Sequence, residues 1–171
     1  VHTQSHIDAV KRLSREGKAR ISLDTYLTPM AAEVALLAAS SAVCATSAVL
    51  EGKVENAFSV MRTPGHHALS TRAMGYCIFN NAAIAAAYAR REHGLTRVMI
   101  VDIDAHHGNG TEEIFYGSDQ VLFVSLHQHP WFPGTGVWHR NGAEAGQGYN
   151  YNVELPQWSG DQAYQQLIEE L

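Results

Sequence analysis

The segment RVMIVDID, residues 97–104, limits the possible folds more than any other part of the chain. Four consecutive apolar residues lead into two aspartates, and such a run is typical of a strand that is buried on both faces of a parallel sheet. Two further apolar stretches, AFSVM at 57–61 and VLFVSLH at 121–127, also predict strands, the first of them short and buried. Alternation over residues 149–155 predicts a fourth strand.

Helices are predicted between these strands. Periodicity and boundary residues place them at 5–15, 31–50, 81–93, 111–116 and 161–171. Asn80 or Asn81 can cap the third helix, and Gly94 can end it. Because helices alternate with buried strands, we expect an α/β fold of three layers, with a mostly parallel sheet flanked by helices.

Composition excludes several classes of protein. The 171 residues are enough for one domain, and the net charge of −5 gives no electrostatic reason to expect nucleic acid or an anionic membrane as partner. Two cysteines are too few for a disulfide framework, so we expect a reducing, cytoplasmic compartment. Residues 31–50 are long enough to span a membrane, but their Ala, Ser and Thr content favours a buried helix.

Histidine follows three of the predicted strands. Seven of the ten histidines lie between His66 and His139, in the segments TPGHH, DAHHGNG and HQHP and at His139 itself. Functional sites of parallel α/β sheets form at the carboxyl ends of the strands. We therefore expect the three segments to form one site, and we expect His2, His6 and His93 to be solvated surface residues.

The DIDAH segment has the donors of a metal site. Side chains repeat every two residues along a strand, so Asp102, Asp104 and His106 should project to one side. Zinc accepts such oxygen and nitrogen ligands, although Asp104 and His106 are one fewer than the three protein ligands usual at catalytic zinc. The residues alone leave a second interpretation open, in which an aspartate caps the turn and His106 binds backbone.

The RTPGHHA segment is suited to proton transfer. Adjacent histidines cannot easily bind one metal ion, but His66 and His67 could each be tuned by a polar partner, with Asp102 and Asn109 as candidates. Two exposed loop histidines are the simpler alternative. Glycines beside aromatic residues in GYCIFN and FPGTG suggest a narrow pocket, and Cys77 is expected to be an inert core thiol.

The motifs RTPGHHA, GYCIFNN, VDIDAHHGNGT, SLHQ and FPGTG, in this order, resemble the histone deacetylase family of the arginase/deacetylase fold. The HHGNGT form is most similar to the class II and bacterial deacetylase-like amidohydrolase branch. The resemblance implies that Asp104 and His106 are two of three zinc ligands. It also implies catalytic and substrate-binding roles, with His66 and His67 at the metal-bound water, Asp102 and Asn109 behind them, and Gly75, Tyr76 and Phe132 lining an acyl-lysine tunnel.

The resemblance further implies two structural K⁺ sites. The positions that match the first are Asp102, Asp104, His106, Ser125 and Leu126, and those that match the second are Phe115, Ser118, Val121 and Tyr151. The implied reaction is zinc-dependent hydrolysis of an N-acetyl amide in an acetylated lysine peptide. An acetylated small amine such as an acetylpolyamine is the alternative substrate, and an arginase-like manganese hydrolase fits the segment less well.

The chain also departs from the family pattern. The third zinc ligand, an aspartate, and the tyrosine of a later glycine-rich loop have no match in residues 1–171, and the family's opening strand has none either. We therefore expect a single deacetylase-like domain over 1–171, truncated at both ends and nearly inactive alone. A catalytically dead remnant or binding module is the alternative. Thr63 stands where the family usually has proline. Asp24 is a poor match for the acidic residue at the pocket rim of some relatives. A truncated sheet would also expose an edge strand, which could allow a homo-oligomer.

Overall fold

A parallel sheet of three strands, in the order β3-β4-β5, forms the centre of the computed structural model, which describes residues 1–17 and 19–170. The strands are β3 (Val98–Asp102), β4 (Val121–Gln128) and β5 (Asn150–Leu155). A separate antiparallel pair, which the sequence did not predict, is formed by β1 (Ala19–Arg20) and β2 (Tyr26–Leu27). The helices are α1 (Gln4–Glu16), α2 (Ala31–Leu50), α3 (Asn81–His93), α4 (Asn109–Phe115) and α5 (Asp161–Glu170), with a short 3₁₀ helix η1 (Glu144–Gly146).

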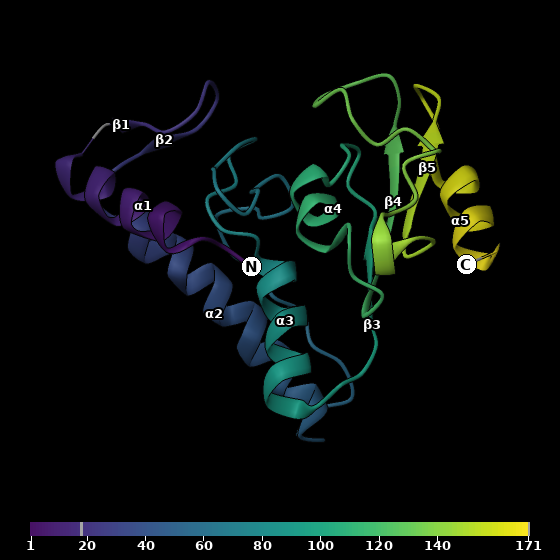
Figure 1. The fold of residues 1–171 in the computed structure, drawn as a ribbon, viewed down its shortest axis with the longest axis horizontal. Coiled ribbons are helices and arrows are strands. Elements are labelled where there is room, and N and C mark those ends of the chain that lie inside the picture. The colour runs from purple at the N-terminus through teal and green to yellow at the C-terminus, as the bar shows by residue number, and fades with distance from the viewer. Residues whose placement is uncertain (18, 171) are drawn as a thin grey trace.

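Helices flank the sheet, as Figure 1 shows, and this confirms the predicted α/β class. On one face, Val124, Leu126 and Leu155 pack against α5. On the other side, α4 lies between α3 and the sheet. A second apolar cluster joins α1, α2 and residues 78–79 around Val10 and Leu27, both fully buried. Because the three strands are parallel, their carboxyl ends lie together at one edge of the sheet.

Local signals set the helix boundaries well. The side chain of Asn80 accepts a hydrogen bond from the backbone N–H of Ala83 at 3.1 Å, which caps α3 as predicted. Gly94 ends the helix with a left-handed backbone at φ +70°. Strands β4 and β5 also lie within one residue of their predicted bounds.

The predicted strand at 57–61 is wrong. These residues form no ladder, and their large side chains are exposed, with Phe58 92% and Val60 78% accessible. A strand is stable only when its backbone groups are paired with a neighbour. Within the described residues no strand lies hydrogen-bonded to this segment, so its apolar content alone does not make it a strand.

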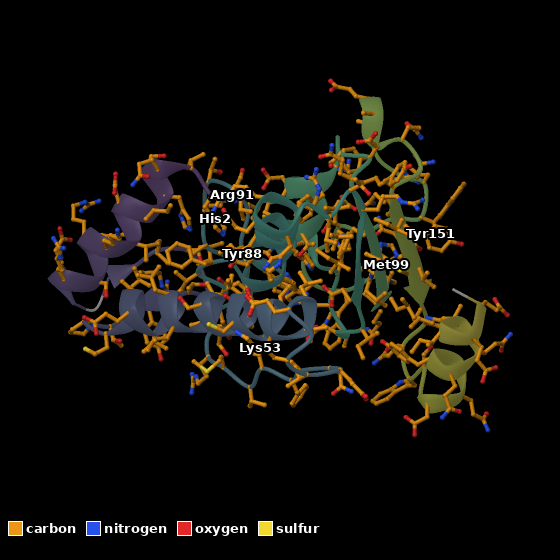
Figure 2. The ribbon with its side chains drawn as sticks, turned by 90° about the horizontal axis from the view of Figure 1, so that it is seen from below. His2, Lys53, Tyr88, Arg91, Met99 and Tyr151 are labelled. Carbon is orange, nitrogen blue, oxygen red and sulfur yellow. The ribbon has the colours of Figure 1, made fainter. Side chains whose placement is uncertain are left out.

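Burial on both faces was also predicted wrongly for β3. Met99, Val101 and Ile103 are 47%, 43% and 59% exposed, because β3 is an edge strand and α5 covers only the part of that face nearer β5. The uncovered part is a depression of about 340 Å³ lined by Met99 and Tyr151, both labelled in Figure 2. An apolar run therefore shows that a strand is suited to burial, but the strands and helices packed beside it decide whether its side chains are buried.

Helix α2 is less buried than predicted. Its buried residues are four alanines, Ala32, Ala35, Ala38 and Ala39, while Leu36 and Leu37 are exposed. Helices α1 and α3 cover one side of it, and burial of the other side would need a partner that the described residues do not provide. With a mean hydropathy of 1.7, α2 is the one described helix that could cross a membrane by length and composition, a test that core helices of soluble proteins also pass.

Two histidines outside the cluster are structural, contrary to the prediction that they are solvated. His2, labelled in Figure 2, donates from Nδ1 to the carbonyl of Leu69 at 2.9 Å and accepts at Nε2 from the backbone N–H of Asn80 at 2.8 Å. Burial and the nearby His6 lower the pKa of His2 to about 4. His6 itself is buried, with Nε2 2.9 Å from the carbonyl oxygen of Ile78. The two imidazoles thus connect the start of the chain to the segment before α3.

Candidate metal and proton-transfer site

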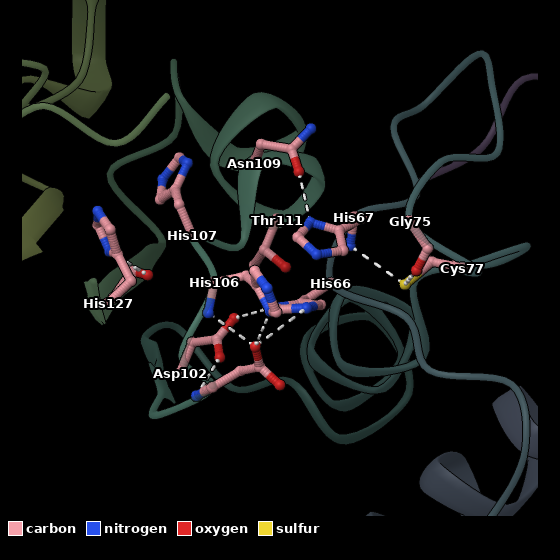
Figure 3. A network of polar contacts seen from close by, with 12 residues as sticks. His66, His67, Gly75, Cys77, Asp102, His106, His107, Asn109, Thr111 and His127 are labelled. Atoms are coloured by element: carbon pink, nitrogen blue, oxygen red, sulfur yellow. Dashed lines mark hydrogen bonds and ion pairs between the residues drawn. The ribbon is translucent and has the colours of Figure 1, made fainter. Parts of the chain in front are cut away.

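Two of the three histidine segments expected to form one site, TPGHH and DAHHGNG, meet at the carboxyl edge of the sheet. The third, HQHP, does not join His66 and His106 there, because His127 is buried against the ring of His107 at 4.7 Å and contacts Ser125 and Gly136. Asp102, the last residue of β3, pairs in register with Ser125 of β4. The TPGHH segment is held against the start of α4, because Gly110 donates its backbone N–H to the carbonyl of His66 at 2.9 Å. Figure 3 shows His66, His67, Asp102 and His106 converging there. Segments 36 residues or more apart in sequence therefore form one polar cluster.

His66 is paired with Asp102. The Nδ1 atom of His66 lies 2.8 Å from Oδ2 of Asp102, and the two side chains are only 16% and 12% exposed. Burial opposes protonation, but the hydrogen bond and charge of Asp102, together with the charge of Asp104, outweigh it and raise the pKa of His66 above its ordinary value. His66 is therefore biased toward the charged imidazolium.

His67 is held in the opposite state. Its Nδ1 donates to Oδ1 of Asn109 at 2.7 Å, which leaves Nε2 as the acceptor atom of a neutral ring. Burial and the neighbouring His66, whose ring lies 4.0 Å away, lower the pKa of His67 to about 4. The pair consequently combines a ring that favours a proton with one that can accept a proton at neutral pH.

Asp104 and His106 bring two metal-ligand atoms together. Oδ1 of Asp104 lies 3.0 Å from Nδ1 of His106 and also accepts the backbone N–H of His106 at 2.8 Å. Tetrahedral zinc, with bonds of about 2.1 Å, holds neighbouring ligand atoms roughly 3.4 Å apart, so one ion could bind both atoms if their hydrogen-bonded separation opened by about 0.4 Å. Burial opposes ionisation of Asp104, but hydrogen bonds from His106 and the charge of His66 lower its pKa.

Asp104 also caps the turn, as in the second interpretation, because it accepts the backbone N–H of His106. Within residues 1–17 and 19–170, no group of three His, Cys, Asp or Glu side chains could hold a metal ion. The described residues therefore bring together two side chains of the kind that bind zinc, Asp104 and His106, and zinc binding by them stays a prediction.

The predicted walls line a pocket beside these groups. Its volume is about 390 Å³, and it is lined by Asp24, Pro64, His66, His67, Gly75, Tyr76, Asp104, His106 and Phe132. The ring of Phe132 meets those of His67 and His106 edge-on at 5.0 and 5.8 Å. Gly75 has φ +57°, and a Cβ there would overlap the ring of His67. The pocket therefore has one aromatic wall and one wall where the backbone itself contacts the histidine.

Cys77 lies behind this wall and is not a nucleophile. The thiol is fully buried, donates to the carbonyl oxygen of Gly75 at 3.4 Å, and burial raises its pKa to about 12. A thiol in that state has almost no reactive thiolate. The structure thus agrees with the expected inert role.

The two groups of positions expected to bind K⁺ also come together in part. In the first, Asp102 and Ser125 are register partners, and Ser125 and Leu126 are fully buried. In the second, Ser118 donates its N–H to the carbonyl of Phe115 at 2.9 Å. Val121 begins β4, and Tyr151 pairs with Val124 three residues along that strand. Cation binding at either group stays a prediction.

Two features of the site region were not predicted. Trp131 covers the outer side of His106, with the ring centroids 4.5 Å apart. Asp24 accepts hydrogen bonds from the backbone of Gly75, at 3.1 Å to Oδ1 and 3.0 Å to Oδ2. These contacts join residues far apart in the chain, and the only local signal was the polar cluster at Ser22 and Asp24, which is typical of a turn.

Comparison with known proteins identifies relatives over the whole chain. A sequence model described as the histone deacetylase domain matches residues 1–171. A probable deacetylase from Archaeoglobus fulgidus is 43% identical over 171 residues, which are 100% of this chain and 47% of that protein. A histone deacetylase-like amidohydrolase from Pseudomonas aeruginosa is 41% identical over 172 residues, covering 100% of this chain and 45% of that protein.

A solved structure gives the same result. The crystal structure of the HDA15 HD domain matches with a TM-score of 0.88 at 43% identity, over 90% of this chain and 44% of that one. The chain spans less than half of the length of each of these three proteins. Because the family match extends from the first residue to the last and the fold agrees, this chain belongs to the histone deacetylase domain family.

Proposed function

We propose that this chain is part of a zinc-dependent deacetylase that hydrolyses the N-acetyl amide of acetylated lysine in a peptide. One observation carries the proposal. Two adjacent histidines, His66 bonded to Asp102 and His67 bonded to Asn109, lie directly beside the Asp104–His106 pair. Amide hydrolysis needs a group that removes a proton from water and a group that stabilises the developing negative charge.

Asp104 and His106 would hold the zinc ion. Their ligand atoms lie close together, and the remaining protein ligand would come from residues other than those described. When bound, zinc would polarise the amide carbonyl and lower the pKa of a coordinated water. The neighbouring K⁺ positions, if filled, would add positive charge near the site, and both cations remain proposals.

The chain's own residues would move the protons. His67 lines the pocket, and its Nε2, left as the acceptor atom, would accept a proton from the water as the water oxygen bonds to the amide carbon. His67 would then deliver that proton to the leaving amine nitrogen as the carbon–nitrogen bond breaks, so that acetate and the free amine result. The charged ring of His66, held by Asp102, would stabilise negative charge on the reacting carbonyl oxygen.

The pocket walls would select the substrate. Phe132 and the Gly75–Tyr76 segment border the 390 Å³ pocket and would contact the methylene chain of an acetylated lysine. Trp131 and Tyr76 are 49% and 65% exposed, and a bound peptide would contact them. Hydrolysis of acetylpolyamines with no activity on peptides would overturn the substrate assignment while leaving the reaction class intact.

The test combines deacetylation with a metal assay. A fluorogenic acetyl-lysine peptide would be incubated with residues 1–171 and with the complete natural protein, with and without added zinc. We expect activity in the complete protein that depends on zinc. Asp104→Ala and His106→Ala should each lower zinc affinity by at least roughly 100-fold, whereas the exposed His139→Ala should retain it. Zinc retention in both ligand variants would contradict the assigned site.

A further inference from the structure

Two consecutive backbone amides in the pocket wall are bound by a loop more than 50 residues earlier in the chain. The N–H of Gly75 donates to both carboxylate oxygens of Asp24, at 3.1 and 3.0 Å. The N–H of Tyr76 donates to the hydroxyl oxygen of Thr25 at 3.0 Å. That hydroxyl in turn donates to Oδ1 of Asp24 at 2.9 Å, so the four residues form one connected set, here called the Asp24 clamp.

The wall segment has an unusual backbone that needs such support. Gly75 has φ +57° and Tyr76 has φ +62°, both in the left-handed region. For a tyrosine this region is sparsely populated and persists only where surrounding contacts hold it. The two N–H groups of this segment have separate acceptors in the same loop, the Asp24 carboxylate for Gly75 and the Thr25 hydroxyl for Tyr76.

The carboxylate is suited to this structural task. A hydroxyl donor from Ser22 also reaches Oδ1 of Asp24, at 2.8 Å. Burial opposes ionisation, but the hydrogen bonds from Ser22, Thr25 and Gly75 outweigh it and hold the pKa of Asp24 below its ordinary value. Oδ1 thus has three donors from the protein itself, and Oδ2 has one.

The Asp24 clamp lies between two pockets. Asp24 and Phe132 line the 390 Å³ pocket and also an adjoining one of about 570 Å³. The wall that the clamp holds is in direct contact with His67, because a Cβ at Gly75 would lie 2.7 Å from Cγ of that histidine. Any movement of the wall would therefore change the width of the pocket and the space available to the ring.

We infer that Asp24 and Thr25 are positioning residues, which fix the Gly75–Tyr76 wall of the acyl pocket without contacting the reacting atoms. The inference rests on the proposed function only in naming the wall as a substrate wall. A positioning role differs from direct binding of the substrate by Asp24. If Asp24 bound the substrate directly, removal of the Thr25 hydroxyl would leave substrate binding unchanged.

The first measurement is amide hydrogen exchange at Gly75 and Tyr76 in the complete natural protein. Asp24→Asn and Thr25→Val should raise exchange at these amides by roughly 10- to 100-fold, since Asn leaves Gly75 one neutral acceptor in place of a carboxylate and Val leaves Tyr76 none. Thr25→Ser keeps the hydroxyl and should restore protection. Asp119→Asn, an exposed change of the same charge, is the matched control.

Kinetics then separate positioning from direct binding. We expect both clamp variants to raise KM for an acetyl-lysine substrate roughly 10-fold, with a smaller change in kcat. The pH profile should be unchanged, because His66 and His67 keep Asp102 and Asn109. A defect in Asp24→Asn that is absent from Thr25→Val and seen only with longer peptides would show that Asp24 contacts substrate, and would overturn the inference.

Amide exchange tests the clamp even if the protein has no deacetylase activity. In that case the proposed function is wrong, and the exchange result still decides whether Asp24 and Thr25 hold the wall. Unchanged exchange in both clamp variants would overturn the inference whatever the kinetics. If Asp24→Asn does not fold, Ser22→Ala removes one hydroxyl donor to the carboxylate and leaves the rest. It should then raise exchange at Gly75 a few-fold, and no change there would count against the clamp.

Discussion

Glu112 of α4 is a buried carboxylate whose charge should contribute measurably to stability. Only 5% of its side chain is exposed. Oε1 accepts from Nε of Arg140 at 2.9 Å, and Oε2 accepts from the side-chain amides of Asn150 and Asn152 at 3.0 and 2.8 Å. Nε2 of His107 lies 3.2 Å from Oε2. The carboxylate therefore connects α4, β5 and the loop before η1.

The size of the effect follows from the pKa of Glu112. Burial opposes its ionisation, but the neighbouring His107, Asn152 and Arg140 lower the pKa from 4.5 to about 2. A difference of roughly 2.5 units between unfolded and folded chains corresponds to about 3 kcal/mol. Because the folded pKa is the lower one, this stability is fully present above pH 4.5 and is lost as the pH falls toward 2, by about 1.4 kcal/mol per pH unit.

Urea denaturation at pH 7, 5, 4 and 3 measures this contribution. We expect Glu112→Gln to have a free energy of unfolding about 3 kcal/mol below that of the natural protein at pH 7. The difference between the two should shrink below pH 4.5, because protonation removes the same charge from the natural chain. Glu169→Gln, at an exposed position, is the matched control and should follow the natural protein throughout. A difference that stays constant from pH 7 to pH 3 would refute the reasoning.

Three further predictions concern packing and thiol chemistry. Gly75→Ala should displace the ring of His67 and lower the deacetylation rate on the order of 100-fold, measured with the fluorogenic peptide. Iodoacetamide at pH 8 should modify the exposed Cys44 in the native protein and the buried Cys77 only after unfolding, as read by mass spectrometry. Leu126→Ala, at a fully buried position under α5, should lower the free energy of unfolding by roughly 2–5 kcal/mol in urea.

The parts of the fold that the sequence predicted are those with local causes. Asn80 caps α3 through a contact with Ala83, and Gly94 ends the helix through its own backbone, so three or four neighbouring residues contain the whole signal. The strand expected at 57–61 failed for the opposite reason. Whether an apolar segment pairs in a sheet depends on a partner distant in sequence, and apolar content says nothing about that partner.

The candidate site divides in the same way. The contacts of Asp102 with His66 and of Asn109 with His67 were expected, because a recognisable motif fixes both members of each pair. The bond from Gly75 to Asp24 was not, although it joins residues 51 apart and borders the same pocket. No periodicity relates a turn near the start of the chain to the wall of a pocket, so only the folded structure reveals it.

The glycines of the motifs have a physical explanation in the geometry of the site. A Cβ at Gly75 would overlap the ring of His67, and one at Gly108 would overlap the Oδ2 atom of Asp102 that binds His66. Each glycine thus allows the backbone to approach a polar side chain more closely than any other residue could. Burial lowers the pKa of both imidazoles, and their partners make the two values diverge, because Asp102 raises the pKa of His66 whereas the neighbouring His66 lowers that of His67 further. The glycines are therefore part of the proton chemistry, although they carry no functional group.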